Sequence, residues 1–376
     1  FRNKKKPIVL IAGCVAQAEG EILLKKENYI DAVIGPQSYQ KINKIILEIE
    51  NKKKKIDATE FEVISKFDQL KLIKNSDNKI SSFLTIQEGC DKFCKFCVVP
   101  YTRGPEHSRS LSEIIVEAKQ LVDNGVKEII LLGQNVNAYN FKNKRLSDLL
   151  YSLNEIKSLE RIRYTTSHPK DFTNDLIEAH GKCSKLMPLL HLPVQSGSTK
   201  VLSEMNRNHS INEYLEIIAQ LREKNKLIKF SSDFIIAYPG ETETDFAKTV
   251  SLMKKIEFIN SYSFIFSARP GTPAGSLKQI DKKIAKERLF TFQNVADQIK
   301  KNYRNKLINS VTKVLFENKI KDKNQFFGRD EYFNSVIVDS SKNLAGKTMN
   351  VKINQCNHNT LFGELVLNKL PEEYAA

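Results

Sequence analysis

The sequence predicts a mixed α/β protein whose main domain is a parallel sheet, either open or curled into a partial barrel. The first observation behind this is that six short apolar, β-rich segments alternate with amphipathic helical patterns between residues 80 and 267. The second is a smaller α/β pattern over residues 1–66, and the third is a small antiparallel β-barrel pattern over residues 307–370. A polar linker is expected at 67–79, and the main domain at 80–306.

The six strands of the main domain are expected at fairly regular intervals. They cover residues 83–86, 128–132, 161–165, 189–192, 232–237 and 262–266. Several of the helices between them open with a capping box, in which a Ser or Thr and an acidic residue satisfy the free amides of the first turn. The capping boxes are Ser110-x-x-Glu113, Ser210-x-x-Glu213 and Thr242-x-x-Asp245. Because ligands of parallel sheets bind beyond the carboxyl ends of the strands, the functional site is expected there.

The two flanking parts have simpler patterns. Near the start, a strand is expected at 8–12, a turn at Gly13-Cys14, a helix over 16–25 and a second strand at 32–34. After a helical segment from 282 to about 308, the chain changes to short β-type runs. These runs cover residues 311–316, 335–338, 349–353 and 361–367.

Composition narrows the class of protein. No apolar run approaches the roughly 18 residues that a membrane span needs, so we expect a cytoplasmic protein with no membrane association. In that compartment, the six cysteines indicate metal or redox ligands rather than disulfides. Lys and Arg outnumber Asp and Glu by 59 to 44, giving a net charge of +15 that favours a nucleic-acid partner. Solvated lysine runs such as 52–55 are the alternative explanation of this charge.

Three of the cysteines form a C-x3-C-x2-C motif directly after the first strand of the main domain: Cys90, Cys94 and Cys97. A structural zinc site takes four ligands, and here the fourth would have to come from far along the chain. A four-iron cubane cluster is different, because three thiolates hold three irons and leave one iron open for an external ligand. The motif therefore favours an iron–sulfur cluster over a zinc site or a set of unligated cysteines.

This motif, placed after the first strand of a partial α/β barrel, resembles that of the radical S-adenosylmethionine (SAM) superfamily. In that superfamily, SAM chelates the open iron, and the position of Phe96 packs against the adenine of SAM. The wider sequence resembles the methylthiotransferase branch through the motifs GCVAQAEGEI, CVVPYTRGPEHSR, LLGQNVNAY, HLPVQSGS and SDFIIAYPGETETDF. Three of these motifs, CVVPYTRG, LLGQNVN and HLPVQSGS, look like the MiaB subfamily, the tRNA 2-methylthio-N6-dimethylallyladenosine synthases.

The resemblance implies a partial (βα)6 barrel and a C-terminal TRAM domain that binds RNA. It implies a transferase that methylthiolates C-2 of N6-dimethylallyladenosine at tRNA position 37, beside the anticodon. The reduced cluster would cleave one SAM to a 5′-deoxyadenosyl radical, an auxiliary 4Fe-4S cluster would supply sulfur, and a second SAM would supply the methyl group. The implied partners are prenylated tRNA and an electron donor such as flavodoxin or ferredoxin, and the protein is expected to be a monomer.

The candidate site residues follow the same motifs. The resemblance implies that Cys14 is one of three ligands of the auxiliary cluster and that the other two lie before Phe1. The chain is therefore expected to lack its natural N-terminus and to build only the radical SAM cluster.

Contacts with SAM or adenine are expected from a set of residues at the carboxyl ends of the strands. For each of these residues, an ordinary loop hydrogen bond is the alternative. This set comprises Gly133, Gln134, Ser167, His168, Gln195 and Ser196. Anion or RNA contacts are expected from Arg103, Arg109 and Arg269.

Two other functions remain open at this point. The first is a methylthiotransferase that acts on threonylcarbamoyl-adenosine in tRNA, or on an aspartate of a ribosomal protein. The second belongs to another class, a non-catalytic RNA-binding protein stabilised by zinc. The absence of a second cysteine pair near residues 90–97 argues against the zinc protein.

Overall fold

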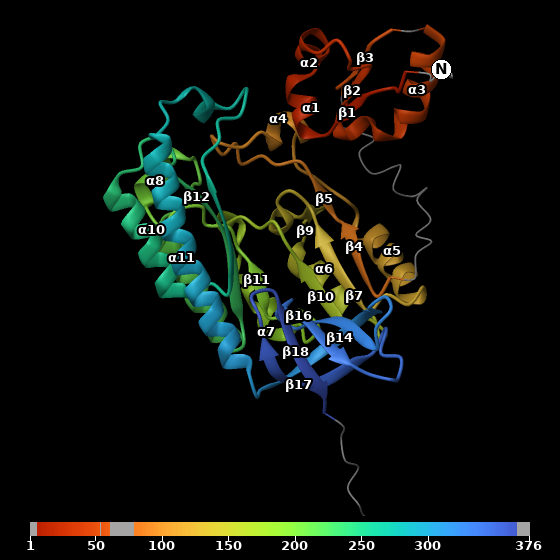
Figure 1. The fold of residues 1–376 in the computed structure, drawn as a ribbon, viewed down its shortest axis with the longest axis vertical. Helices are drawn as coiled ribbons and strands as arrows, with labels where there is room; N and C mark the ends of the chain where they lie inside the picture. Colours follow the sequence, from red (N-terminus) through yellow and green to blue (C-terminus); the bar gives the residue numbers. More distant parts are fainter. Residues whose placement is uncertain (1–5, 53, 61–78, 367–376) are drawn as a thin grey trace, which may run out of the picture.

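Two three-stranded parallel sheets form the centre of the protein (Figure 1). The first contains β4 (Ser81–Thr85), β7 (Glu128–Leu132) and β10 (Arg161–Tyr164), and the second contains β11 (Leu189–His191), β12 (Lys229–Ile236) and β13 (Asn260–Ile265). A parallel bridge between Ile162 and Leu186 joins the sheets, so the six strands follow one another in chain order. All six expected strands are present, and the parallel arrangement is confirmed. The computed structural model describes residues 6–52, 54–60 and 79–366.

Helices pack against one face of this curved sheet and enclose the main hydrophobic core. They are α5 (Leu111–Asp123), α6 (Leu146–Asn154), α7 (Asn174–Lys182), α8 (Thr199–Glu204), α9 (Ile211–Lys224), α10 (Glu243–Ile256) and α11 (Lys282–Leu307). Fully buried residues of the strands, such as Leu84, Ile129 and Phe234, belong to the same core as Ile114 of α5 and Phe292 of α11. The capping boxes at the starts of α9 and α10 are both complete, which explains why these helices begin where the sequence predicts.

The N-terminal part is a three-stranded parallel sheet in the order β1 (Leu10–Ala12), β2 (Ala32–Ile34), β3 (Ile56–Ala58). Its helices are α1 (Cys14–Glu19), α2 (Glu21–Lys26) and α3 (Ile42–Lys52). The single helix expected over 16–25 is divided into α1 and α2 at Gly20, whose φ of 43° does not fit a helix. The strand β3 was not expected in its lysine-rich surroundings, and the expected linker lies outside the described residues except for Lys79.

The C-terminal part is a closed barrel of five strands in the order β14-β15-β16-β18-β17. The strands are β14 (Val311–Lys319), β15 (Gln325–Asp330), β16 (Ser335–Asp339), β17 (Thr348–Cys356) and β18 (Thr360–Leu365). The barrel was expected to be antiparallel. Four of its five pairs of neighbouring strands are antiparallel, and the pair β16 and β18 is parallel. The sequence did not predict β15, because its Gly, Arg and Asp residues interrupt the apolar pattern.

The C-terminal barrel is docked against the amino ends of β7 and β10, at the opposite end of the sheet from α4 (Val99–Arg103) (Figure 1). Arg161 donates to the backbone oxygens of Arg329 (2.8 Å) and Lys313 (2.9 Å). Arg163 donates to the backbone oxygen of Asp330 (2.9 Å) and pairs with the buried Glu128 (2.8 Å). Two buried arginines of the central sheet therefore hold the barrel in place. No helix in the described ranges is long and apolar enough to cross a membrane.

Candidate active site

The three predicted cysteines lie in one loop at the carboxyl end of β4, residues 89–98, which we call the cysteine loop. The loop follows β5 (Gln87–Glu88) and leads into α4. Its first residue must be glycine, because φ at Gly89 is 84° and a Cβ atom would lie 2.0 Å from the Pro105 oxygen. The Cys90 N–H donates to the Gly104 oxygen at 3.1 Å, and the Cys97 N–H donates to the Cys94 oxygen at 2.9 Å. These bonds fold the loop that carries the three thiols back on itself.

The cysteine loop is also electrostatically distinctive. Burial, with smaller contributions from the charges of Glu106, Cys94 and Cys97, raises the pKa of the Cys90 thiol to about 12. Burial likewise raises the pKa of Cys97. The buried guanidinium of Arg207 lies with its Nη1 3.6 Å from the Cys94 sulfur. The thiols of Cys90 and Cys97 therefore stay protonated without a metal, whereas a bound metal would hold its cysteine ligands as thiolates and Arg207 would offset part of their charge.

The donors present fit an iron–sulfur cluster. Three thiols from one loop are the soft ligands that such clusters require. Within the described ranges, no three His, Cys, Asp or Glu side chains are grouped so that they would hold a metal ion. A cubane cluster does not need such a group, because each thiolate binds a different iron of the cluster.

A buried glutamine that the sequence reasoning missed, Gln87, connects the cysteine loop to the next strand. Its side-chain nitrogen donates to the Gly89 oxygen at 2.7 Å, and its side-chain oxygen accepts from the N–H groups of Gln134 (2.9 Å) and Asn135 (3.1 Å). A Cβ atom at Gly133 would lie 2.6 Å from that oxygen, so glycine is required there. The side chain of Gln134 in turn accepts from the Gly89 N–H at 2.8 Å. Gly133 and Gln134, expected to contact SAM, therefore support the cysteine loop.

A second polar network ties the cysteine loop to the loops after β7 and β10. The side-chain nitrogen of Asn135 donates to Glu106 (3.0 Å) and to Asp171 (2.7 Å), and Lys92 pairs with Asp171 (2.6 Å). Burial raises the pKa of Glu106, although the bond from Asn135 opposes this shift. Lys92, Glu106 and Asp171 line a cavity of about 250 Å³ together with Tyr139 and others from the same loops. Asn135 and Glu106 lie in two of the quoted motifs, but the sequence did not predict that they would meet, because they are far apart in the chain.

Ser167 and His168, at the carboxyl end of β10, lie where the sequence analysis placed them. The hydroxyl of Ser167 and the Nε2 atom of His168 are buried and have no hydrogen-bond partner within the part of the chain that the structure describes. Asn137 fixes this turn, because its side chain accepts from the His168 N–H and donates to the His168 oxygen, both at 2.8 Å. Burial, together with the charge of Arg207, lowers the pKa of His168, so the ring is neutral. Two unpaired polar groups therefore remain for a ligand.

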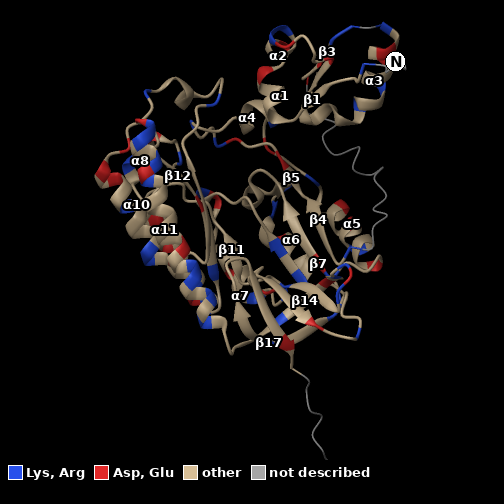
Figure 2. Cartoon of the chain, in the orientation of Figure 1, with Lys and Arg blue, Asp and Glu red and all other residues tan. Residues whose placement is uncertain are grey.

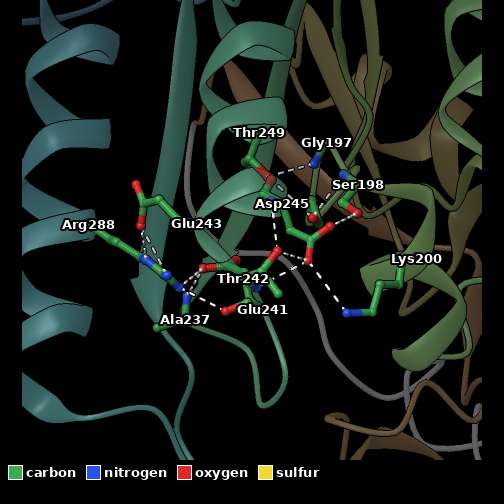
Figure 3. A network of polar contacts seen from close by, with 11 residues as sticks. Gly197, Ser198, Lys200, Ala237, Glu241, Thr242, Glu243, Asp245, Thr249 and Arg288 are labelled. Atoms are coloured by element: carbon green, nitrogen blue, oxygen red, sulfur yellow. Dashed lines mark hydrogen bonds and ion pairs between the residues drawn. The ribbon is translucent and has the colours of Figure 1, made fainter.

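The HLPVQSGS motif forms a loop that is fastened to α10 (Figure 3). Ser196 is fully buried, and its hydroxyl lies 3.3 Å from that of Thr249. A Cβ atom at Gly197 would lie 2.5 Å from the Lys248 oxygen, so the backbone approach to α10 requires glycine. Ser196, expected to contact SAM or adenine, has a partner in the protein. Gln195 has a φ of 77°, which is unusual for a residue other than glycine.

The acidic residues of YPGETETD hold this region together through hydrogen bonds and ion pairs. Burial opposes the charge of Asp245, but hydrogen bonds from Ser198 and Thr242 outweigh it and lower its pKa to about 2. Figure 3 shows Asp245 between these two residues, with Lys200 at 3.7 Å. Burial raises the pKa of Glu241 to about 7, although Arg288 donates to it at 3.0 Å. The capping role expected for these acidic residues is therefore confirmed for Asp245.

The three candidate anion-binding arginines differ in their surroundings. Arg109 is buried and donates to the Thr85 oxygen (2.7 Å) and to Glu117 (2.6 Å), so its guanidinium is already engaged in the protein. Arg103 donates to Glu88 at 3.1 Å and also bonds the Cys14 thiol. Arg269 is exposed on the turn after β13, where its side chain faces solvent. Of the three, Arg269 has the surroundings that an RNA contact requires.

Cys14 is the first residue of α1, and the structure brings it to the cysteine loop. Besides its bond with Arg103, it is close enough to Cys97 for its charge to raise the pKa of that thiol. The side chain of Gln37 supports this contact by donating to the Arg103 oxygen at 3.1 Å.

Phe96, the residue expected to pack against the adenine, is partly buried in a small apolar cluster. The buried members of this cluster are Val201, Met205, Tyr238, Phe266 and Ala274.

Comparisons with known proteins agree with this architecture. The profile of the Radical SAM superfamily matches residues 84–253, and that of the TRAM domain matches residues 305–366. A tRNA-2-methylthio-N(6)-dimethylallyladenosine synthase from Pelagibacter ubique (strain HTCC1062) is 60% identical over 371 residues, which cover 97% of this chain and 83% of that protein. The protein of the same name from Rickettsia akari (strain Hartford) is 46% identical, covering 96% of this chain and 82% of the relative.

Among solved structures, the cobalamin-dependent SAM radical enzyme OxsB aligns with a TM-score of 0.49 and 10% identity, over 78% of this chain and 45% of that one. The match of 60% identity to a curated relative extends over 97% of this chain. This chain therefore belongs to the radical SAM family of tRNA-2-methylthio-N(6)-dimethylallyladenosine synthases.

Proposed function

We propose that this protein is a radical SAM tRNA methylthiotransferase that modifies C-2 of N6-dimethylallyladenosine at position 37, beside the anticodon. The observation that carries the proposal is the cysteine loop, with three cysteines in one loop at the carboxyl end of β4, in a chain 60% identical to a synthase of that name. The substrate is tRNA, and a 4Fe-4S cluster and SAM are the cofactors that membership of the radical SAM family brings.

The residues in and around the cysteine loop have distinct roles in this proposal. Cys90, Cys94 and Cys97 hold the cluster, and Arg207 offsets the charge of Cys94. Gln87 and Gln134 fix the backbone at Gly89, so that the thiols keep their relative positions. The chemistry that a bound cluster and SAM supply is reductive cleavage of SAM, which yields the radical that removes the hydrogen from adenine C-2.

The neighbouring polar groups suit the binding of SAM. Ser167 offers a buried hydroxyl and the neutral His168 offers a ring nitrogen, and neither atom has a partner in the described part of the protein. Buried polar groups in proteins are nearly always hydrogen-bonded, so an unpaired pair at the carboxyl end of a strand favours a ligand site. Phe96 is proposed to pack against the adenine, and its partial burial in the apolar cluster that includes Tyr238 supports this. The rigid polar networks around Asn135 and Asp245 hold the loops of the site in place.

Cys14 is proposed as a ligand of a second, auxiliary 4Fe-4S cluster that provides the sulfur. Its position beside Arg103 and close to Cys97 supports this, because sulfur has to be delivered near the site where the radical forms. The electron donor is proposed to be a flavodoxin or ferredoxin, and the enzyme is proposed to act as a cytoplasmic monomer.

The proposal is tested by anaerobic reconstitution of the full-length protein. Iron and sulfide are counted per chain, and 5′-deoxyadenosine and methylthiolated adenosine are measured with prenylated tRNA. About eight irons and both products are expected for two cubane clusters. Unprenylated tRNA, tRNA carrying threonylcarbamoyl-adenosine and ribosomes serve as alternative substrates. Modification of one of these instead would replace the proposed substrate, and one zinc with no sulfide would rule out radical chemistry.

A further inference from the structure

A cavity of about 330 Å³ lies between the end of α11 and the turn that joins β17 to β18, away from the cysteine loop. Lys300, Lys301 and Arg304 of α11 line one wall of this cavity. Asn357 and His358 of the turn line the opposite wall. The cavity is thus formed jointly by the central domain and the C-terminal barrel.

Arg304 is the best-buried cation of the cavity, with only 4% of its surface exposed. Its Nε donates to the Asn357 oxygen at 3.1 Å, and its Nη1 lies 3.4 Å from the Asn334 side-chain oxygen. Its Nη2 is buried and has no hydrogen-bond partner among the described residues. A guanidinium is always charged and can only donate, so this nitrogen lacks an acceptor. The unmet donor indicates a ligand that carries acceptor oxygens.

The charges of the cavity indicate that this ligand is an anion. Three cationic side chains face one carboxylate, that of Asp297, which lies 3.9 Å from His358 Nε2. Burial lowers the pKa of Lys300, and the charge of Arg304 lowers it further. The same burial lowers the pKa of Arg304. An anion placed among these groups would relieve both the desolvation and the mutual repulsion.

The course of α11 connects this cavity to the active site. The segment that precedes α11 touches the cysteine loop, because the Ala274 N–H donates to the Lys95 oxygen at 2.9 Å. The helix then runs for 26 residues, roughly 39 Å, to the cavity (Figure 1). Lys and Arg are concentrated near both of its ends (Figure 2). A polyanion long enough to extend from the cysteine loop to the barrel would therefore meet basic side chains at both ends of α11.

We propose that this cavity binds one backbone phosphate of the tRNA substrate and so sets the position of the RNA along α11. The inference rests on the proposed function, because it takes tRNA as the substrate. A phosphate contact of this kind adds affinity and fixes orientation without reading the base sequence. The oxygens of the phosphate accept from Arg304 Nη2, while Lys300 and Lys301 balance its charge.

The test compares two double variants of the full-length enzyme that remove the same charge from adjacent lysines. Lys300→Gln/Lys301→Gln alters the cavity, and Lys254→Gln/Lys255→Gln alters an exposed pair at the end of α10. Arg304 is left unchanged, because it also bonds Asn357 and Asn334 across the interface with the barrel. The dissociation constant for prenylated tRNA is measured over a range of salt concentrations. The cavity variant is expected to weaken binding severalfold and to reduce the salt dependence by about one unit, with little change in the control.

Each other outcome has a definite meaning. Equal effects of the two variants overturn the cavity as an RNA contact and leave the proposed function intact. Failure of the unaltered enzyme to bind tRNA overturns the proposed function itself. Inorganic phosphate is tested separately by its effect on the melting temperature. If phosphate stabilises the unaltered enzyme more than the cavity variant while tRNA binding is unchanged, the cavity is a site for free phosphate and the RNA assignment is wrong.

Discussion

At the scale of single residues, the cysteine loop depends on side chains that are distant from it in sequence. Arg207 reaches Cys94 from the segment after α8, and Gln134 reaches Gly89 from the end of β7. Each of these contacts determines either the charge around the thiols or the backbone that carries them. The chemistry of the site therefore depends on residues beyond the three ligands.

Arg207 provides the first prediction. Replacement by Met removes a buried positive charge 3.6 Å from Cys94 Sγ. Because the reduced cluster is the more negative form, loss of this charge destabilises the reduced form relative to the oxidised form. The reduction potential of the reconstituted cluster, measured by redox titration with electron paramagnetic resonance, is expected to fall by about 60 mV or more, which is tenfold in the one-electron equilibrium constant. Arg207→Lys keeps the charge and is the matched control. Equal potentials in the Met and Lys variants would contradict the proposed role of the charge.

Glu241 gives a prediction about pH. Its pKa is about 7 in the folded protein and near 4.5 in an unfolded chain, so the folded state binds more protons between these values. This group therefore contributes stability below pH 4.5, and the contribution is lost as the pH rises toward 7. The loss is at most about 3 kcal/mol. Glu241→Gln does not titrate, so its free energy of unfolding should fall less than that of the unaltered protein between pH 5 and 7. Parallel pH profiles of the two proteins would refute this.

At the scale of helices and strands, the capping boxes link the active-site loop to the outer helices. Asp245 caps α10, and it also accepts from Ser198 in the HLPVQSGS loop at 2.7 Å. Glu213 occupies the corresponding third position of α9, where it bonds the exposed backbone of Ser210. Glu213 also pairs with Lys170 at 4.0 Å on the surface, so the same local motif makes an exposed tertiary contact in α9 and a buried one in α10.

The comparison of these two caps is a third prediction. Asp245→Ala removes a helix cap and leaves the buried Ser198 hydroxyl without its acceptor, so it should lower the free energy of unfolding by about 2–4 kcal/mol. Glu213→Ala removes an exposed cap and an exposed ion pair with Lys170, and it should cost clearly less. Urea denaturation of both variants measures the difference. A loss in Asp245→Ala no larger than that in Glu213→Ala would show that the bond to Ser198 contributes little.

The sequence predicted the elements with strong local patterns. Six strands of the main domain and the capped helices α9 and α10 were identified, because apolar runs and capping residues are local signals. The strand β15 was missed because its Gly328 and charged residues break the apolar pattern.

In the candidate site, the cysteine loop was found from the spacing of its cysteines. Its supports, Gln87 and Arg207, were not found, because their partners are brought close only by the fold. For the same reason, Arg109 and Ser196 were expected to contact ligands but have partners within the protein.

At the scale of the whole molecule, the two flanking parts meet opposite ends of the central sheet. The N-terminal part brings Cys14 to the carboxyl end, and the C-terminal barrel is held at the amino end by Arg161 and Arg163 (Figure 1). The long helix α11 joins the two ends. Any tRNA that contacts both the cysteine loop and the barrel has to extend along the molecule, so the position of the barrel affects where the RNA lies.

The two docking arginines allow a prediction about this arrangement. Arg161 and Arg163 both donate to backbone oxygens of the barrel, but only Arg163 pairs with the buried Glu128. Arg161→Met should weaken the docking and leave the central domain stable. Arg163→Met also leaves the buried Glu128 carboxylate without its ion-pair partner. This loss should lower the free energy of unfolding by about 3–5 kcal/mol. Calorimetry should therefore show the barrel unfolding apart from the central domain in both variants. The central domain should melt at a lower temperature in Arg163→Met than in Arg161→Met. A single transition with the same melting temperature in both variants would contradict the distinct roles of these arginines.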